Sequence, residues 1–323
     1  MVQKTEWTLF STDGGNRLHA ITWRPEGPVR AILILSHGMV EYVDRYDGFA
    51  RYACGRGLLV SGHDHLGHGQ SVASEADLGY FAPKKGFDCL VEDIHRHRER
   101  VAAQHPGVPV FVLGHSMGSF VIRNYIQRHA DGLAGAIIMG TGNQPRIAAR
   151  MGRLISGFLM KIKGPRYRSA FVNSLALGGL NKAFKPVRTP NDFISRDTAV
   201  VDAYCRDPLC SFMFTVSAYH DMFGGMLALS DKDRLQAMPR TLPILLASGE
   251  QDPLGGMGKG IRKLCRSYQQ LGMQDVTLRL YPQDRHEILN ELDRDAVYSD
   301  VCAWLESKLK PSIDAAARPQ PIA

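Results

Sequence analysis

The feature that most constrains this chain is an apolar run that ends in a glycine-rich turn and continues into a helical pattern. Residues 108–113 are mostly apolar and rich in valine, residues 114–118 are Gly-His-Ser-Met-Gly, and apolar residues then recur at helical spacing. Strand, tight turn and helix form the context in which Gly-x-Ser-x-Gly makes a nucleophile elbow. Gly114 and Gly118 allow the tight turn because they carry no side chain, which predicts that Ser116 projects outward. An isolated match would be weak evidence, and the flanking strand and helix favour this interpretation.

Strand and helix patterns alternate along most of the chain. Hydrophobic residues make up 44% of the sequence and charged residues 22%, which is typical of a chain with a large buried core. The alternation predicts an α/β protein with a mostly parallel sheet and helices on both of its faces. We expect strands over residues 5–11, 17–23, 31–35, 58–61, 108–113, 133–139, 242–248 and 276–281. The expected helices cover residues 46–56, 87–104, 260–271 and 295–309, besides the one after Ser116.

One segment, residues 143–211, interrupts this alternation after the sixth strand. It contains helix-like pieces at 147–162 and 167–177, separated by glycine and proline, and no convincing strand. An insertion at the carboxyl edge of a parallel sheet lies over the crevice where ligands bind. We therefore interpret it as a helical cap. The predicted organisation is a core of residues 1–142 and 212–310, a cap of residues 143–211, and a loose Ala/Pro-rich tail at 311–323.

Two loops downstream supply partners for a serine nucleophile. A serine hydroxyl needs a base to take its proton and a third group to orient that base. Asp252 directly follows one buried strand and His286 follows the next, so both lie at the same sheet edge as Ser116. The order Ser116, Asp252, His286 along the chain is the one found in proteins that carry their nucleophile on such an elbow. We predict that these three residues are catalytic.

Other residues compete for these roles. An aspartate before proline is often only a turn residue, and Glu250, Asp284 and Glu287 are alternative acids. A histidine-rich loop at residues 63–68 precedes the elbow, so we expect it to support the floor of the site. No matched carboxylate or cysteine set accompanies these histidines, so no metal site is predicted.

An acyl-transfer site also needs backbone donors for an oxyanion. One should be the amide of Met117, directly after the nucleophile. The second should come from the loop after the third strand, residues 37–39. We predict the amide of Met39, with Gly38 allowing the backbone to approach closely.

Several segments together identify a resemblance. They read Ser-His-Gly-Met-Val-Glu with Arg-Tyr four residues later, Asp-His-Leu-Gly-His-Gly-Gln-Ser, Gly-His-Ser-Met-Gly, Gly-Glu-Gln-Asp-Pro and Arg-His-Glu-Ile-Leu-Asn-Glu, at residues 36–46, 64–71, 114–118, 249–253 and 285–291. The chain resembles the monoacylglycerol lipase and lysophospholipase group of the α/β-hydrolase superfamily, with its serine aminopeptidase relatives. The resemblance covers residues 5–309. It implies an α/β-hydrolase fold and a cofactor-free serine hydrolase acting on monoacylglycerols, lysophospholipids or similar esters.

The positive charge of the chain is concentrated in the predicted cap. Residues 143–188 contain ten Lys or Arg and no Asp or Glu, whereas the formal net charge of the whole chain is +7. These charges interleave with apolar residues, among which Leu154, Ile155, Phe158 and Leu159 are predicted to line an acyl pocket. Either the helix touches a lipid surface, or its apolar face packs on the core while the charges are solvated. A nucleic-acid partner is not expected, since no aromatic stacking platform accompanies the charges.

We therefore expect a carboxylic-ester hydrolase with a single-chain lipid ester as its substrate and no cofactor. A general carboxylesterase and an acyltransferase remain open alternatives. A peptidase is disfavoured because the first 46 cap residues offer no acidic anchor for a substrate amino terminus. A non-catalytic ligand-binding protein would have no reason to keep all the triad residues. The absence of a signal segment and of a long apolar run, together with six scattered cysteines, predicts a cytoplasmic protein. The basic cap predicts peripheral contact with a membrane. The sequence does not indicate an oligomeric state.

Overall fold

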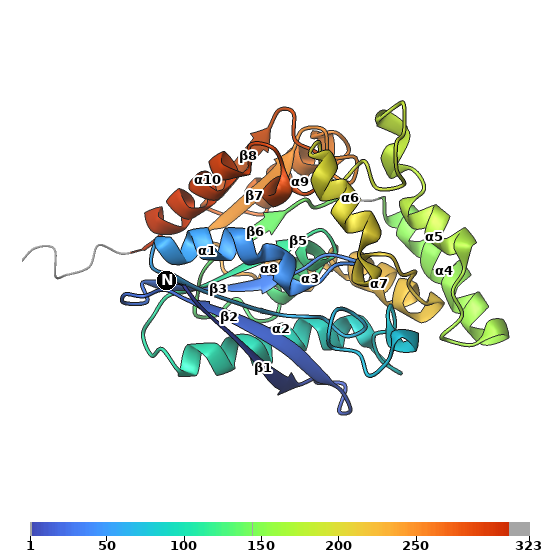
Figure 1. Cartoon of the computed structure of the whole chain (residues 1–323), viewed down its shortest axis with the longest axis horizontal. Coiled ribbons are helices and arrows are strands. Elements are labelled where there is room, and N and C mark those ends of the chain that lie inside the picture. The colour runs from blue at the N-terminus through green and yellow to red at the C-terminus, as the bar shows by residue number, and fades with distance from the viewer. Residues whose placement is uncertain (1, 144, 310–323) are drawn as a thin grey trace, which may run out of the picture.

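A twisted eight-stranded sheet runs through the described part of the chain, residues 2–143 and 145–309 of the computed structural model (Figure 1). The strand order is β1-β2-β4-β3-β5-β6-β7-β8, and β2 runs in the opposite direction to the other strands. The strands are β1 (Gln3–Phe10), β2 (Arg17–Arg24), β3 (Ala31–Ser36), β4 (Leu58–His63), β5 (Val110–His115), β6 (Leu133–Met139), β7 (Ile244–Gly249) and β8 (Val276–Tyr281). All eight predicted strands are present.

The central strands form because their sequences suit burial on both faces. Every residue of β3, β4, β5 and β7 is buried, which explains the apolar run with which each of these strands begins. Successive side chains alternate between two hydrophobic clusters on opposite faces. In β3, for example, Ile32 and Ile34 belong to one cluster, and Leu33 and Leu35 to the other.

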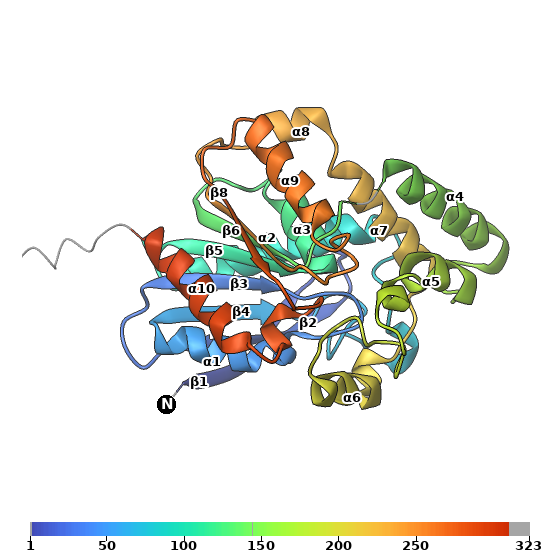
Figure 2. The same ribbon diagram turned by 90° about the horizontal axis from the view of Figure 1, so that it is seen from above.

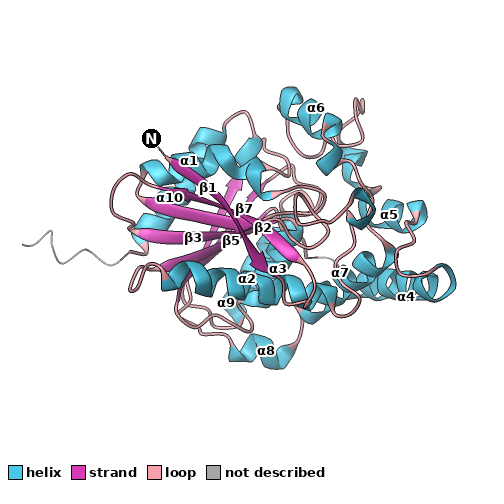
Figure 3. Cartoon of the chain, turned by 60° about the horizontal axis from the view of Figure 1, so that its bottom comes forward, coloured by secondary structure: helices cyan, strands magenta, loops and turns pink. Residues whose placement is uncertain are grey.

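Helices cover both faces of this sheet (Figure 3). Residues of α1 and α10 pack in one hydrophobic cluster, and residues of α2, α3, α7 and α9 pack in the other. The α-helices are α1 (Asp47–Gly55), α2 (Gly86–Ala103), α3 (Met117–Tyr125), α4 (Arg146–Lys163), α5 (Ala170–Leu177), α6 (Thr198–Arg206), α7 (Val216–Ala228), α8 (Lys232–Ala237), α9 (Lys259–Gln270) and α10 (Arg294–Ser307). The predicted α/β-hydrolase arrangement is thereby confirmed, although α6, α7 and α8 were not predicted.

The chain between β6 and β7 leaves the sheet and forms a helical layer at its carboxyl edge (Figure 2). The helices α4, α5 and α6 lie in this layer, and its described residues contain no strand. Helix α7 packs along α4 and also contacts α2 and α3, so it joins the layer to the core. The domain boundaries at residues 142/143 and 211/212 stay predictions. The predicted loose tail, residues 311–323, lies outside the described residues.

Among the described residues, none of the helices combines the length and the apolar character that crossing a bilayer requires.

Candidate active site

Ser116 occupies a strained turn between β5 and α3. Its φ of 53° and ψ of −118° are unfavourable for a residue with a side chain, and such strain persists only where the surroundings enforce it. A Cβ atom at Gly118 would collide with the Ser36 carbonyl oxygen, and one at Gly114 with the Gly118 carbonyl oxygen. Both glycines are therefore required by close backbone approach, as predicted. His115 and Met117 are buried on either side, whereas Ser116 stays partly accessible.

Asp252 and His286 meet at the carboxyl ends of β7 and β8. The Nδ1 atom of His286 lies 3.1 Å from Oδ1 of Asp252, although the ring is turned so that its N–H is not aligned with this oxygen. Asp252 is completely buried, and its Oδ1 also accepts a hydrogen bond from the Leu254 amide (2.8 Å). Burial by itself would raise the pKa of Asp252, but the charge of His286 and the Leu254 amide outweigh it, so its pKa is lowered. Asp252 is therefore an anion beside the imidazole.

The three competing acids are each paired with an arginine. Glu250 binds Arg262 at the surface, and Asp284 binds Arg196 at 2.6 Å. Glu287, which directly follows His286, forms a two-pronged ion pair with Arg45, at 2.8 and 2.7 Å. Of the four candidates, Asp252 is the one in contact with the His286 ring.

The loop after β3 passes directly over the elbow. A Cβ atom on Gly38 would lie 3.0 Å from the Cβ of Ser116, so the loop can approach this closely only with glycine there. The amides of Met39 and Met117 have no hydrogen-bond acceptor among the described residues, whereas the Gly38 amide donates to Glu41. Their role as oxyanion donors stays a prediction.

Glu41 is the hub of a buried network that the sequence analysis did not identify. Its carboxylate accepts hydrogen bonds from the Gly38 amide, the Tyr46 hydroxyl (3.0 Å) and Arg45 (3.0 Å), and it contacts Nδ1 of His115 at 3.2 Å. Burial opposes its ionisation, but His115 and Arg45 outweigh that effect and hold the pKa of Glu41 far below its usual value. The only signal was that Glu41, Arg45 and Tyr46 fall within the segments that carry the resemblance.

The same network reaches the loop that carries His286. Arg45 bridges Glu41 and Glu287, and Nε2 of His115 contacts the His286 carbonyl oxygen at 3.2 Å. Burial opposes protonation of His115, but Glu41 outweighs burial and raises the pKa of this imidazole. The network thus ties the elbow, the Gly38 loop and the His286 loop together.

A stack of buried histidines lies behind the Gly38 loop. The rings of His65 and His68 lie 4.4 and 5.1 Å from that of His37, and His63 joins this group to His97. Burial lowers the pKa of all five imidazoles, to about 3 for His68 and His97. These side chains are therefore neutral at pH 7 and serve as packing beneath the loop.

The four residues predicted to line an acyl pocket do not share one environment. Leu154 and Phe158 are 68% and 63% exposed, and both line an open groove of about 1080 Å³ that α4 shares with His220 and Leu227 of α7. Ile155 and Leu159 are half-buried and pack against the core. A role in acyl binding stays a prediction for all four residues.

The comparisons with known proteins agree with this geometry. The chain is 29% identical to the monoacylglycerol lipase of Mycolicibacterium smegmatis, over 93% of this chain and 96% of that protein, and 29% identical to the human monoglyceride lipase, over 93% and 90%. A solved carboxyl esterase from Bacillus coagulans superposes with a TM-score of 0.88 at 27% identity, over 96% of this chain and all of the other. The family model described as serine aminopeptidase, S33, matches residues 27–293. Because that match covers most of the sequence, the chain belongs to the serine aminopeptidase S33 family of α/β-hydrolases.

Proposed function

We propose that this protein hydrolyses carboxylic esters of single-chain lipids, with monoacylglycerol as the main substrate, through an acyl-enzyme on Ser116. The observation that carries the proposal is the contact between Asp252 and His286 at the sheet edge where the strained turn presents Ser116. The two relatives that are named as monoacylglycerol or monoglyceride lipases support the choice of substrate.

In the proposed mechanism, Ser116 Oγ attacks the ester carbonyl while His286 Nε2 takes its proton. Asp252 holds the imidazole tautomer and stabilises the imidazolium. The amides of Met39 and Met117 bind the oxyanion of the tetrahedral intermediate. The intermediate collapses when His286 returns the proton to the leaving alcohol. Water, activated by His286, then attacks the acyl-enzyme and releases the fatty acid.

Labelling and hydrolysis together test this mechanism. We expect a fluorophosphonate probe to modify Ser116 and to block hydrolysis of monooleoylglycerol. Ser116→Ala should abolish both labelling and turnover, while Ser267→Ala, which changes an exposed serine on α9, should leave them unchanged. Turnover that survives in Ser116→Ala would refute the proposal. Labelling of Ser116 without turnover of any ester would instead favour the acyltransferase or amidase alternatives.

We further propose that the outer face of α4 and α5 touches a lipid surface. Large apolar side chains are exposed in one stripe along α4, at Ile147, Met151, Leu154, Phe158 and Ile162, and continue on α5 with Phe171 and Leu175. Large contiguous apolar patches on a soluble surface usually mark an interaction site. The neighbouring cations Arg150, Arg153 and Lys161 have no acidic partner among the described residues, so they remain available to anionic head groups.

Vesicle sedimentation tests this contact. We expect binding to phosphatidylglycerol vesicles that weakens with added salt, and weaker binding to phosphatidylcholine vesicles. Phe158→Ser together with Leu154→Ser should reduce binding, whereas Phe10→Ser, which changes a similarly exposed side chain on β1, should not. Equal binding by all these variants would show that the stripe does not meet the lipid.

A further inference from the structure

A short piece of the cap segment, residues 192–196, runs beside the loop that carries His286. The His286 amide donates a hydrogen bond to the Phe193 carbonyl (3.2 Å), and the Glu287 amide donates to the Ile194 carbonyl (2.7 Å). The Ser195 hydroxyl donates to the Asn290 carbonyl at 3.0 Å. The backbone around the predicted catalytic histidine is therefore held by residues that lie outside the core.

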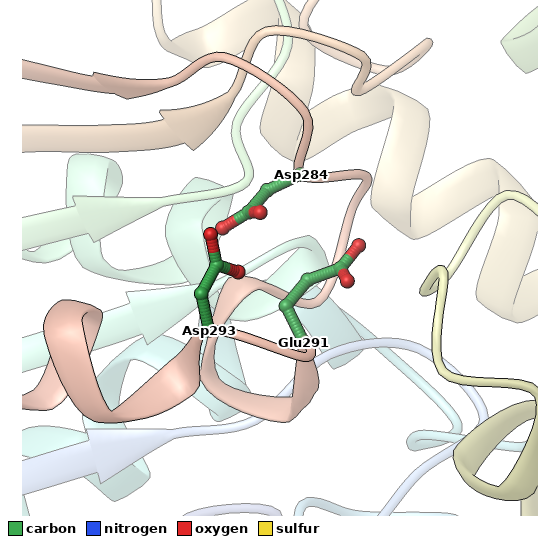
Figure 4. Close-up of side chains that lie close together, drawn as sticks. All are labelled: Asp284, Glu291 and Asp293. Atoms are coloured by element: carbon green, nitrogen blue, oxygen red, sulfur yellow. The ribbon is translucent and has the colours of Figure 1, made fainter.

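Arg196, the last residue of this segment, forms ion pairs with three carboxylates. Its guanidinium binds Asp284 at 2.6 Å, Glu291 at 3.0 Å and Asp293 at 2.7 Å. The Asp284 and Asp293 carboxylates face each other, whereas that of Glu291 is directed to the other side (Figure 4). One oxygen of each of the three nevertheless lies within 4.8 Å of the others. Asp284 and Glu291 are completely buried and bracket His286 in the sequence. Burial and the nearby Asp293 and Glu291 carboxylates raise the pKa of Asp284 to about 7, and Arg196 opposes this shift.

The carboxylate cluster resembles a cation site, but Arg196 already supplies the cation. Its Nη2 atom contacts both Asp284 and Asp293, so one guanidinium nitrogen bridges the two carboxylates. The remaining oxygen of Glu291 accepts hydrogen bonds from the amides of Arg196 and Arg285, at 3.0 and 2.9 Å. A metal ion would have to displace the arginine. We therefore assign no metal to these residues.

We infer that Arg196 is a positioning residue, which fastens the cap segment to the His286 loop and so holds the imidazole in place for catalysis. The inference rests on the proposed function, because it concerns the same histidine. Arg196 does not touch the reacting atoms. It acts by binding three carboxylates at the two ends of this loop and by keeping residues 193 and 194 paired with the loop. Without the guanidinium, the cap segment loses the ion pairs that fasten it there.

The test compares Arg196→Gln and Arg196→Lys with Arg188→Gln. Arg188 is a suitable control because it also forms an ion pair in the cap, with Asp202, but has no contact with the His286 loop among the described residues. Hydrogen exchange at the His286 and Glu287 amides should accelerate at least tenfold in Arg196→Gln. For hydrolysis of a soluble short-chain ester, kcat should fall at least tenfold with KM changed less than twofold. Arg196→Lys should restore part of both effects, and Arg188→Gln should resemble the wild type.

Exchange at these two amides that stays at the wild-type rate in Arg196→Gln would overturn the inference, as would a change in KM alone. If Arg196→Gln does not fold, Arg196→Lys, which keeps the positive charge but lacks the guanidinium that binds three carboxylates, should produce smaller changes in the same two measurements. Unchanged kcat and unchanged exchange in Arg196→Lys would then refute the inference. Failure of the proposed function would give a different result. The wild type itself would then hydrolyse no ester, whereas the faster hydrogen exchange at the His286 and Glu287 amides in Arg196→Gln would still be observed.

Discussion

The buried network behind Ser116 and the outer face of α4 differ in whether their charged side chains are paired. Behind Ser116, Glu41 and Glu287 are buried, Arg45 between them is 12% exposed, and each is matched to an opposite charge. On α4, the cations Arg150 and Arg153 have no acidic partner among the described residues and stand beside exposed apolar side chains. A buried charge must be paired because it loses hydration, whereas a solvated one need not be. The difference indicates that the first region fixes geometry and the second is free to meet a partner.

The largest expected effect lies at the candidate active site itself. Asp252→Asn should lower kcat/KM by about four orders of magnitude, because the amide no longer stabilises the imidazolium or the correct tautomer. Glu250→Gln, on the same loop but paired with Arg262, should stay near the wild type in the same steady-state assay. A large loss in Glu250→Gln with a small one in Asp252→Asn would reverse the assignment of the acid.

Alanine variants of one buried and one exposed phenylalanine compare how much the core and the outer face of α4 contribute to stability. Phe111→Ala in β5 should lower the free energy of unfolding by about 3–5 kcal/mol, since Phe111 is fully buried. Phe158→Ala on α4, where the side chain is 63% exposed, should change it by less than about 0.5 kcal/mol. Urea denaturation of both variants provides the comparison. Similar losses would mean that the α4 face is covered within the protein itself.

The buried histidines predict loss of stability in mild acid. In the folded protein the five imidazoles of the stack have lowered pKa values, whereas the unfolded chain takes up protons near pH 6.5. Stability is therefore fully present above that pH and is lost as the pH falls, by up to about 1.4 kcal/mol per pH unit for each imidazole. Asp93 and Asp284, whose pKa values are raised to about 6 and about 7, act in the opposite direction, as do His19 and His115, whose pKa values are also raised.

The net change should be a loss of stability between about pH 7 and about pH 5.5, measured by urea denaturation. A free energy of unfolding that stays constant or rises over this range would contradict the neutral state of the histidines.

A smaller effect is expected from Glu41→Gln, which keeps the shape of the side chain and removes its charge. We expect kcat to fall about 10- to 100-fold, because hydrogen bonds to a buried charged group contribute about 1.5–3 kcal/mol. Glu6→Gln, at an exposed glutamate that contacts His19, is the control. An unchanged kcat in Glu41→Gln would show that the network does not support the site.

Local patterns predicted the sheet and the principal site residues. The buried strands β5 and β7 begin as apolar runs, and the positions of Asp252 and His286 directly after successive strands placed both at the same edge of the sheet. The ion pair of Arg45 with Glu287 was not predictable, because these residues are 242 positions apart and buried ion pairs have no periodicity. Short helices such as α8, with six residues, also lack a pattern long enough to detect.

In the cap, helical periodicity could identify an apolar helix but not what covers it. Leu154 and Ile155 are adjacent in the sequence, yet the first is exposed and the second packs on the core. The contact of residues 193 and 194 with the His286 loop depends on backbone pairing between distant segments, which side-chain patterns do not encode.

The most direct test is the rate of hydrolysis of a series of monoacylglycerols, from short to long acyl chains, by the wild type and by Ser116→Ala. We predict that kcat/KM rises with chain length in the wild type and that no turnover remains in Ser116→Ala. Activity confined to acetyl and butyryl esters, or activity that persists without Ser116, would contradict the account of a lipid-ester hydrolase acting through this serine.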